Sequence, residues 1–148
     1  MTGKSTWTTA PVLGVSNVRR TAEYYRDVLG FDLDPATGVF QGAGDEPGGL
    51  YAIVRRGGAS LHFQIRRGSL PDRRRTFMER DVYIYVDDVD TLYSELQSRG
   101  ATTVSPPQNA PYGLGEILVE DPNGYRVTFG APLQIRGQGD THGAERSR

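Results

Sequence analysis

Two stretches of this chain follow the same pattern, and this internal repeat restricts the fold more than any other feature of the sequence. Residues 12–30 read VLGVSNVRRTAEYYRDVLG and residues 83–100 read YIYVDDVDTLYSELQSRG, each an apolar strand, an Asn or Asp, and a helix that ends at glycine. The repeat aligns Val15 with Val86, Asn17 with Asp88, Val18 with Val89, and Tyr25 with Leu96. We therefore expect two copies of one structural unit.

Each copy is expected to contain one amphipathic helix. Asn17 and Asp88 can accept hydrogen bonds from the free N–H groups at a helix start. Gly30 and Gly100 allow the left-handed turn that ends a helix. Apolar residues at helical spacing give each helix one face that can be buried. These residues are Val18, Ala22, Tyr25 and Leu29 in the first copy and Val89, Leu92, Tyr93 and Leu96 in the second.

Three strand-like runs follow each predicted helix, so each half reads strand, helix, strand, strand, strand. The runs are 31–34, 50–56, 59–66, 101–104, 114–120 and 125–130. The fold class is therefore α+β, with two tandem βαβββ modules.

The modules are predicted to occupy residues 8–68 and 80–132. Residues 133–148 carry no periodic apolar pattern and are predicted to form a disordered tail.

Alternation along the strands predicts which side chains share a face of the sheet. Apolar residues such as Leu61, Phe63, Val82 and Ile84 fall on one face, where the helices can cover them. The opposite face is mixed, and it is either plain solvent-exposed surface or the lining of a ligand site, which the aromatic content favours. The candidate ligand-binding residues on this face are His62, Gln64, Asp81, Tyr83, Tyr85, Glu116, Arg126 and Thr128.

The charge and composition restrict the partners of the chain. A net charge of -1 and a pI near 6.1 supply no general positive field for nucleic acid or an anionic membrane. The one dense basic patch, Arg73 to Arg75 with Arg66 and Arg67 nearby, is interpreted as a solvated loop rather than a phosphate site. Nucleic acid and membranes are therefore not expected as partners.

Composition also suggests where the protein works. The chain has no Cys, so thiolate nucleophiles and Cys-bound zinc are excluded. No run reaches the length of about 18 apolar residues that a membrane span needs, and residues 1–9 lack a signal-peptide pattern. Every basic residue except Lys4 is Arg, which is typical of a GC-rich genome. A cytoplasmic, bacterial protein is expected.

Two motifs carry a resemblance to a known family. Residues 15–33, VSNVRRTAEYYRDVLGFDL, are similar to the first strand-helix signature of the glyoxalase/bleomycin-resistance/extradiol dioxygenase (vicinal oxygen chelate) superfamily, which ends in FYRDVLGF. Residues 111–129, PYGLGEILVEDPNGYRVTF, resemble its last hairpin and are most similar to bleomycin-resistance proteins, in which a PWGREF-type strand leads into DPxGN. The resemblance implies a curled mixed sheet that forms a cup, and a homodimer.

The resemblance also implies where a metal would sit. Family enzymes take one ligand from each of four strands, and the matching positions here are Ala10, His62, Asp81 and Thr128. Ala10 and Thr128 cannot act as usual ligands, which leaves fewer than the three that catalytic metal sites ordinarily use. No metal or other cofactor is therefore expected, although Gln64 or Glu116 could complete an atypical divalent metal site.

The favoured function is sequestration of a drug-like or aromatic ligand, as in bleomycin resistance, with no turnover. Leu114 and Gly115 depart from the PWGREF pattern, so a planar or cationic compound other than bleomycin is an open alternative. Tyr83, Tyr85 and Trp7 offer stacking surfaces, and Asp81 and Glu116 offer negative charge.

Two other functions stay open at this point. One is a lyase, isomerase or dioxygenase of the superfamily that uses an atypical metal site or His62, the sole candidate base, as acid and base. The other is an interaction module with an empty cup, for which the sequence has no motif.

Overall fold

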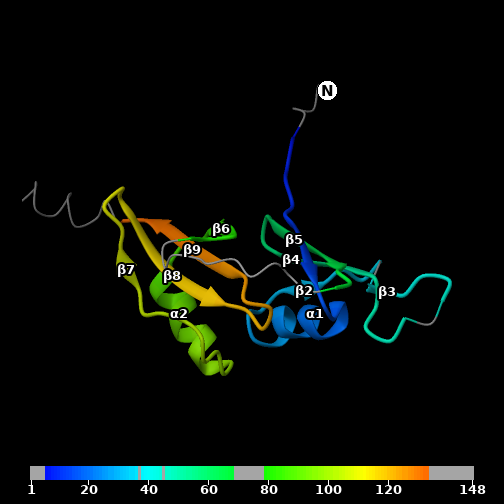
Figure 1. The fold of residues 1–148 in the computed structure, drawn as a ribbon. Helices are drawn as coiled ribbons and strands as arrows, with labels where there is room; N and C mark the ends of the chain where they lie inside the picture. The colour runs from blue at the N-terminus through cyan, green and yellow to red at the C-terminus, as the bar shows by residue number, and fades with distance from the viewer. Residues whose placement is uncertain (1–5, 37, 45, 69–78, 134–148) are drawn as a thin grey trace, which may run out of the picture.

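The computed structural model describes residues 6–36, 38–44, 46–68 and 79–133. Its first half forms one mixed sheet with one helix (Figure 1), in the strand order β1-β5-β4-β2 with β3 also paired to β4. Strand β1 runs parallel to β5, and the other pairings are antiparallel. The elements are β1 (Val12–Val15), α1 (Val18–Asp27), β2 (Asp32–Leu33), β3 (Val39–Phe40), β4 (Tyr51–Arg56) and β5 (Ala59–Ile65).

The second half repeats this topology. Its strand order is β6-β9-β8-β7, with β6 parallel to β9 and the remaining pairs antiparallel. The elements are β6 (Val82–Tyr85), α2 (Val89–Ser98), β7 (Gln108–Asn109), β8 (Leu114–Glu120) and β9 (Arg126–Pro132). The α+β class with two βαβββ modules is thereby confirmed. The tail predicted from residue 133 and the Arg73 to Arg75 patch lie outside the described residues, Leu133 excepted.

Two predicted strands are shorter than expected. Residues 31–34 yield only the two-residue strand β2. Residues 101–104 contribute a single bridge, from Val104 to Val119 of β8. Pro106 and Pro107 follow almost at once and have no N–H to continue the ladder. Pairing with β8 therefore resumes only at β7.

The predicted helix ends are confirmed. The side chain of Asn17 accepts a hydrogen bond from the Arg20 N–H at 3.0 Å, and that of Asp88 accepts from Asp90 N–H at 2.9 Å. Gly30 follows α1 with a φ of +75°, a left-handed conformation in which a side chain would be strained. The same capping interactions thus fix where each helix begins and ends, at corresponding positions in the two modules.

Both helices lie on one side of the sheets, on the lower side in Figure 1. The buried apolar face of each sheet packs against them, with Phe63, Leu96 and Ile117 among the fully buried residues. Within the described part of the chain, neither helix is long and apolar enough to cross a membrane.

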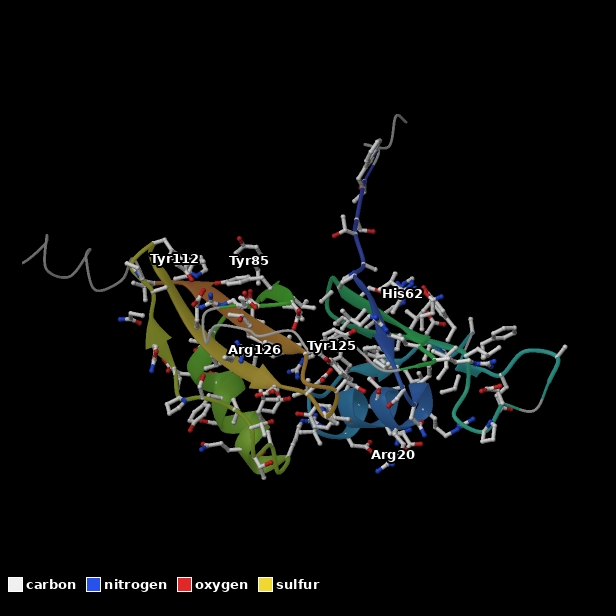
Figure 2. The ribbon with its side chains drawn as sticks, viewed as in Figure 1. Arg20, His62, Tyr85, Tyr112, Tyr125 and Arg126 are labelled. Atoms are coloured by element: carbon white, nitrogen blue, oxygen red, sulfur yellow. The ribbon has the colours of Figure 1, made fainter. Side chains whose placement is uncertain are left out.

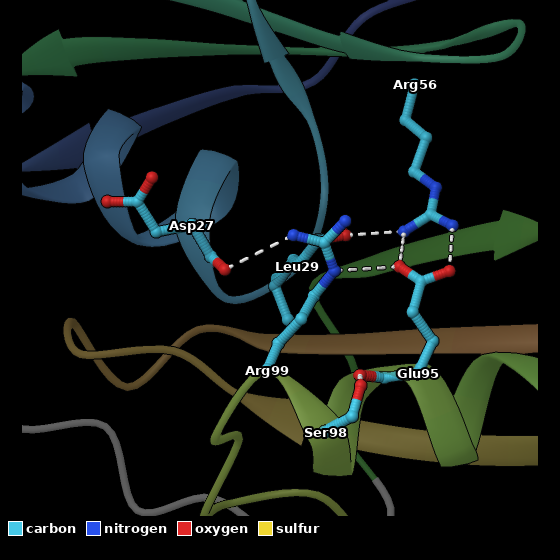
Figure 3. A network of polar contacts seen from close by, with 6 residues as sticks. All are labelled: Asp27, Leu29, Arg56, Glu95, Ser98 and Arg99. Carbon is cyan, nitrogen blue, oxygen red and sulfur yellow. Dashed lines mark hydrogen bonds and ion pairs between the residues drawn. The ribbon is translucent and has the colours of Figure 1, made fainter.

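Polar contacts join the two modules at this helical side. The Tyr25 hydroxyl donates to Asp121 Oδ2 at 2.7 Å, and the Tyr125 hydroxyl donates to the Gly14 carbonyl at 2.7 Å. At a second junction Arg56 of β4 donates to Glu95 of α2, and Arg99, which follows α2, donates to Glu95 and to the Asp27 carbonyl of α1 (Figure 3). The modules are therefore tied together through their helices and turns, while the opposite faces of the sheets stay open.

Candidate functional site

The open face of the second sheet gathers most of the predicted ligand-binding residues. Tyr83 of β6 lies beside Thr128 of β9, and Glu116 of β8 lies beside Gly130 of β9. Alternation along these strands places Tyr83, Glu116 and Thr128 on the side away from α2. Figure 2 shows Tyr85 and Tyr112 on this same side.

Glu116 is the centre of a hydrogen-bonded cluster on this face. Its Oε2 atom accepts from the Tyr83 hydroxyl at 2.7 Å and from the Tyr112 hydroxyl at 2.6 Å. Its Oε1 atom pairs with Arg80 Nη2 at 3.0 Å. The residue is only 8% exposed, so its charge is largely removed from solvent and is compensated by Arg80.

The two phenols are held in their neutral, donating form. The pKa of Tyr83 is raised well above its usual value, first by burial and then by its hydrogen bond to the Glu116 carboxylate. The pKa of Tyr112 is also raised, first by its hydrogen bond to Glu116. Both tyrosines therefore stay donors to Glu116 throughout the neutral pH range.

Tyr83 supports a wider aromatic surface. Its ring lies so close over Gly130 that any Cβ at that position would collide with the phenol. The ring of Tyr85 packs against Tyr83, with centroids 5.2 Å apart and planes tilted by 54°. Tyr85 is 74% exposed and Tyr112 is 59% exposed. The face thus presents two accessible rings around a half-buried third.

The remaining predicted residues of this module have structural contacts. Asp81 Oδ2 accepts from the Arg126 backbone N–H at 2.9 Å, which joins the starts of β6 and β9. The Arg126 guanidinium donates to the Glu79 carbonyl at 3.3 Å. Thr128 is fully buried, and its hydroxyl has no hydrogen-bond partner among the described residues.

His62 and Gln64 belong to the first sheet. The Tyr51 hydroxyl and His62 Nδ1 are 2.6 Å apart, and their rings meet edge to face at 5.5 Å. Gln64 is exposed and lies two residues further along β5, on the same face as His62. The candidate metal ligands His62 and Asp81 therefore each bond within their own module.

Two of the four positions that match the family's metal ligands carry side chains that are not usual ligands. Position 10 carries the methyl group of Ala10, and the Thr128 hydroxyl is buried in β9. Among the residues that the structure describes, no group of three or more His, Asp or Glu side chains could hold a metal ion. The residues present do not fit the family metal.

A cleft of about 890 Å³ opens at the junction of the modules. Its walls include Trp7 and Pro11 of the N-terminal segment, the turn between β4 and β5, and strand β6. Tyr83 and Tyr85 are the predicted site residues that reach it. Its volume is within the range of small-molecule sites.

Sequence reasoning missed three contributors to these sites. Tyr112 occupies the aromatic position of the PWGREF-like motif, which was the available signal. Tyr51 follows the alternation of β4, so its position opposite the apolar face could have been read from the sequence. Arg80 precedes β6 in a segment without periodicity, and no sequence signal marks it.

Comparison with known proteins identifies the fold and the family of this chain. The paired βαβββ modules define a fold shared with many solved structures. The family model of the Glyoxalase/Bleomycin resistance protein/Dioxygenase superfamily matches residues 8–129, and the chain belongs to that superfamily. No curated protein matches the chain.

Three solved structures illustrate the likeness. The bleomycin-binding protein of Streptomyces verticillus, complexed with copper(II)-bleomycin, is 27% identical, with a TM-score of 0.64 over 86% of this chain and 97% of that one. The bleomycin resistance determinant encoded on transposon Tn5 is 22% identical, with a TM-score of 0.64 over 87% and 100%. A glyoxalase-related enzyme from Clostridium phytofermentans is 16% identical, with a TM-score of 0.67 over 88% and 98%.

Proposed function

We propose that this protein binds a small aromatic molecule and sequesters it, in the manner of a bleomycin-resistance protein. The observation that carries the proposal is the aromatic face of the second sheet, where Tyr85 and Tyr112 are exposed beside Tyr83. Exposed tyrosines supply large, flat contact area at low entropic cost. The 27% identity to a bleomycin-binding protein supports the same class of ligand.

Binding is proposed to need no metal on the protein. The support is chemical: Ala10 and Thr128 stand at two of the family ligand positions, and Asp81 already accepts a backbone hydrogen bond. Recognition is therefore assigned to ring stacking and shape. In this proposal the protein confers antibiotic resistance in the bacterial cytoplasm.

The functional unit is proposed to be a homodimer. The sheets expose their non-helical faces, and Phe40, Tyr85 and Val12 are large apolar side chains exposed on the protomer. A second copy laid across these faces would turn two open surfaces into an enclosed cup. Light scattering coupled to size-exclusion chromatography tests this: a monomer at micromolar concentration would contradict it.

Isothermal titration calorimetry tests ligand binding directly. The protein is titrated with metal-free bleomycin, with copper(II)-bleomycin, and with flat aromatic drugs. The proposal expects saturable binding at one site per protomer, with a negative heat-capacity change from apolar burial. Absence of binding to every compound, or turnover of any of them, would overturn it.

A second function is favoured by one contact, the 2.6 Å hydrogen bond between the Tyr51 hydroxyl and His62 Nδ1. A tyrosine that fixes a histidine ring leaves the other ring nitrogen available for proton transfer, as in a general acid or base. In this alternative the protein is a superfamily enzyme. Metal analysis of protein purified without chelators, followed by ligand binding and turnover by His62→Ala, separates the two functions.

A further inference from the structure

The carboxylate of Glu116 is already committed to groups of this chain. A carboxylate offers about four acceptor positions, and three are taken by Tyr83, Tyr112 and Arg80. The residue is 8% exposed. With three positions occupied and little of the side chain exposed, Glu116 is better placed to hold these three groups than to meet the charge of a cationic ligand.

The same hydrogen bonds fix the rings that a ligand would meet. Tyr112 lies in the turn before β8 and is tied to the sheet by its hydroxyl at 2.6 Å from Glu116 Oε2. Tyr83 is held between Glu116 at its hydroxyl end, Gly130 beneath its ring, and Tyr85 beside it. Tyr112 is thus anchored by its hydroxyl and Tyr85 by its contact with Tyr83, and both rings remain largely exposed.

We propose that Glu116, supported by Arg80, is a positioning residue that holds Tyr83 and Tyr112 in place. The ligand is accordingly a planar aromatic compound recognised by its ring faces, and a positive charge on it is not required. This inference rests on the proposed function. It predicts that uncharged and cationic ring systems of the same shape depend on Glu116 to the same extent.

Two matched probes test the inference. Acridine is uncharged at pH 8, whereas 9-aminoacridine has nearly the same ring system and is a cation at that pH. Dissociation constants are measured by calorimetry for the wild type, Glu116→Gln and Tyr112→Phe. Glu120→Gln, an exposed change on the same strand, and Tyr93→Phe, a tyrosine on α2 that accepts from Gln97, serve as controls.

The expected losses follow from the entropic cost of immobilising, on binding, side chains that the substitution has loosened. Glu116→Gln frees two rings and should weaken both probes by about tenfold. Tyr112→Phe keeps its ring but loses its anchor, and it should weaken both by about threefold. The control variants should bind as the wild type does. Loss confined to 9-aminoacridine would make Glu116 a counter-ion and overturn the inference, as would wild-type binding by both test variants.

A readout without ligand separates failure of this inference from failure of the proposed function. Alkaline titration followed by ultraviolet absorbance reports tyrosine ionisation. Because hydrogen bonds to Glu116 help to raise the pKa of both Tyr83 and Tyr112, Glu116→Gln should make two tyrosines titrate earlier, and in the Tyr112→Phe background only the one at position 83 should do so. If no probe binds the wild type but this shift is seen, the proposed function fails and the positioning role stands. An unchanged titration would overturn the positioning role.

Discussion

The junction formed by Arg56, Glu95 and Arg99 allows a quantitative test of how the modules hold together (Figure 3). Glu95 receives two hydrogen bonds from the Arg56 guanidinium, at 2.8 and 2.7 Å, and a third from Arg99 Nε at 3.0 Å. Arg56 Nη1 also donates to the Leu29 carbonyl at the end of α1, at 2.7 Å. One carboxylate of α2 therefore binds both Arg56, which comes from β4 of the first module, and Arg99, which follows α2.

Replacing Glu95 by Gln should lower the free energy of unfolding by about 2 kcal/mol. The side chains of Arg56, Glu95 and Arg99 are 35%, 32% and 39% exposed. In a buried site a charge-assisted hydrogen bond contributes roughly 1.5–3 kcal/mol to stability. Because these side chains are partly exposed, we assign each bond the upper limit for surface pairs, about 1 kcal/mol. Glu95 accepts three such bonds and Gln can keep one, so the loss of two bonds costs about 2 kcal/mol. This corresponds to a decrease of about 4–8 °C in melting temperature.

The sign of the pH dependence is a further check on the same variant. Hydrogen bonds from Arg56 hold the pKa of Glu95 below its usual value. The stabilisation is therefore fully present above the pKa of the unfolded chain, about 4.3, and is lost as the pH falls through the folded value. The stability difference between wild type and Glu95→Gln should be largest near neutrality and should shrink below about pH 4.

Urea unfolding followed by circular dichroism at several pH values measures both effects. Glu46→Gln is the matched control, because Glu46 pairs with the exposed Arg67 through one contact of 3.0 Å, and its loss should cost less than about 0.5 kcal/mol. Equal effects of Glu95→Gln and Glu46→Gln, or a Glu95→Gln effect that does not change between pH 7 and acid, would refute the reasoning.

Three further variants test individual contacts. Thr128→Val removes a buried hydroxyl that lacks a partner among the described residues. Thermal melting should therefore show the same stability or an increase of up to about 1 kcal/mol. A decrease in stability would show that the hydroxyl has a hydrogen-bond partner. Gly130→Ala places a Cβ against the Tyr83 ring and should cost about 1–3 kcal/mol, whereas Gly58→Ala, with no atom within 4 Å of its Cβ, should cost little. Burial raises the pKa of Asp121. Stabilisation by its protonated form is therefore fully present below the pKa of the unfolded chain and is lost as the pH rises through the folded pKa. The stability of the wild type relative to Asp121→Asn should decrease over this pH range, and a difference that stays constant would contradict the assignment.

The fold could be predicted because its determinants are local. The caps Asn17 and Asp88 and the glycine after α1 act within a few residues of the helices they limit. Strand alternation is also local, and it separated the helix-covered face from the mixed one. The strand over 101–104 was wrongly extended because its length depends on pairing with β8, which Pro106 and Pro107 interrupt.

The site was predictable only as a set of residues on a face. Alternation placed Tyr83 and Glu116 on one side of the sheet, but their contact depends on the register of β6, β9 and β8. Arg80 and Tyr112 lie outside regular strands, so periodicity carries no information about them. The surroundings of Glu116 are therefore a tertiary property, since two of its three partners come from the segments before β6 and before β8.

The repeat explains why the modules share a backbone but differ in chemistry. The strand registers make Val12 and His62 of the first module equivalent to Tyr83 and Thr128 of the second. In the next pair on this face, Gly14 and Gln64 correspond to Tyr85 and Gly130.

In the first module the large polar side chains lie on the later strand, β5, whereas in the second the large aromatic ones lie on the earlier strand, β6. Each of these cross-strand pairs combines a larger with a smaller residue, but the larger one lies on opposite strands in the two modules. This exchange leaves His62 with a module-internal tyrosine partner and replaces its counterpart by the buried Thr128. Tyr83 can lie on that face only beside small residues on β9, because its ring leaves no space for a Cβ at Gly130 and pairs with Thr128 across the strands.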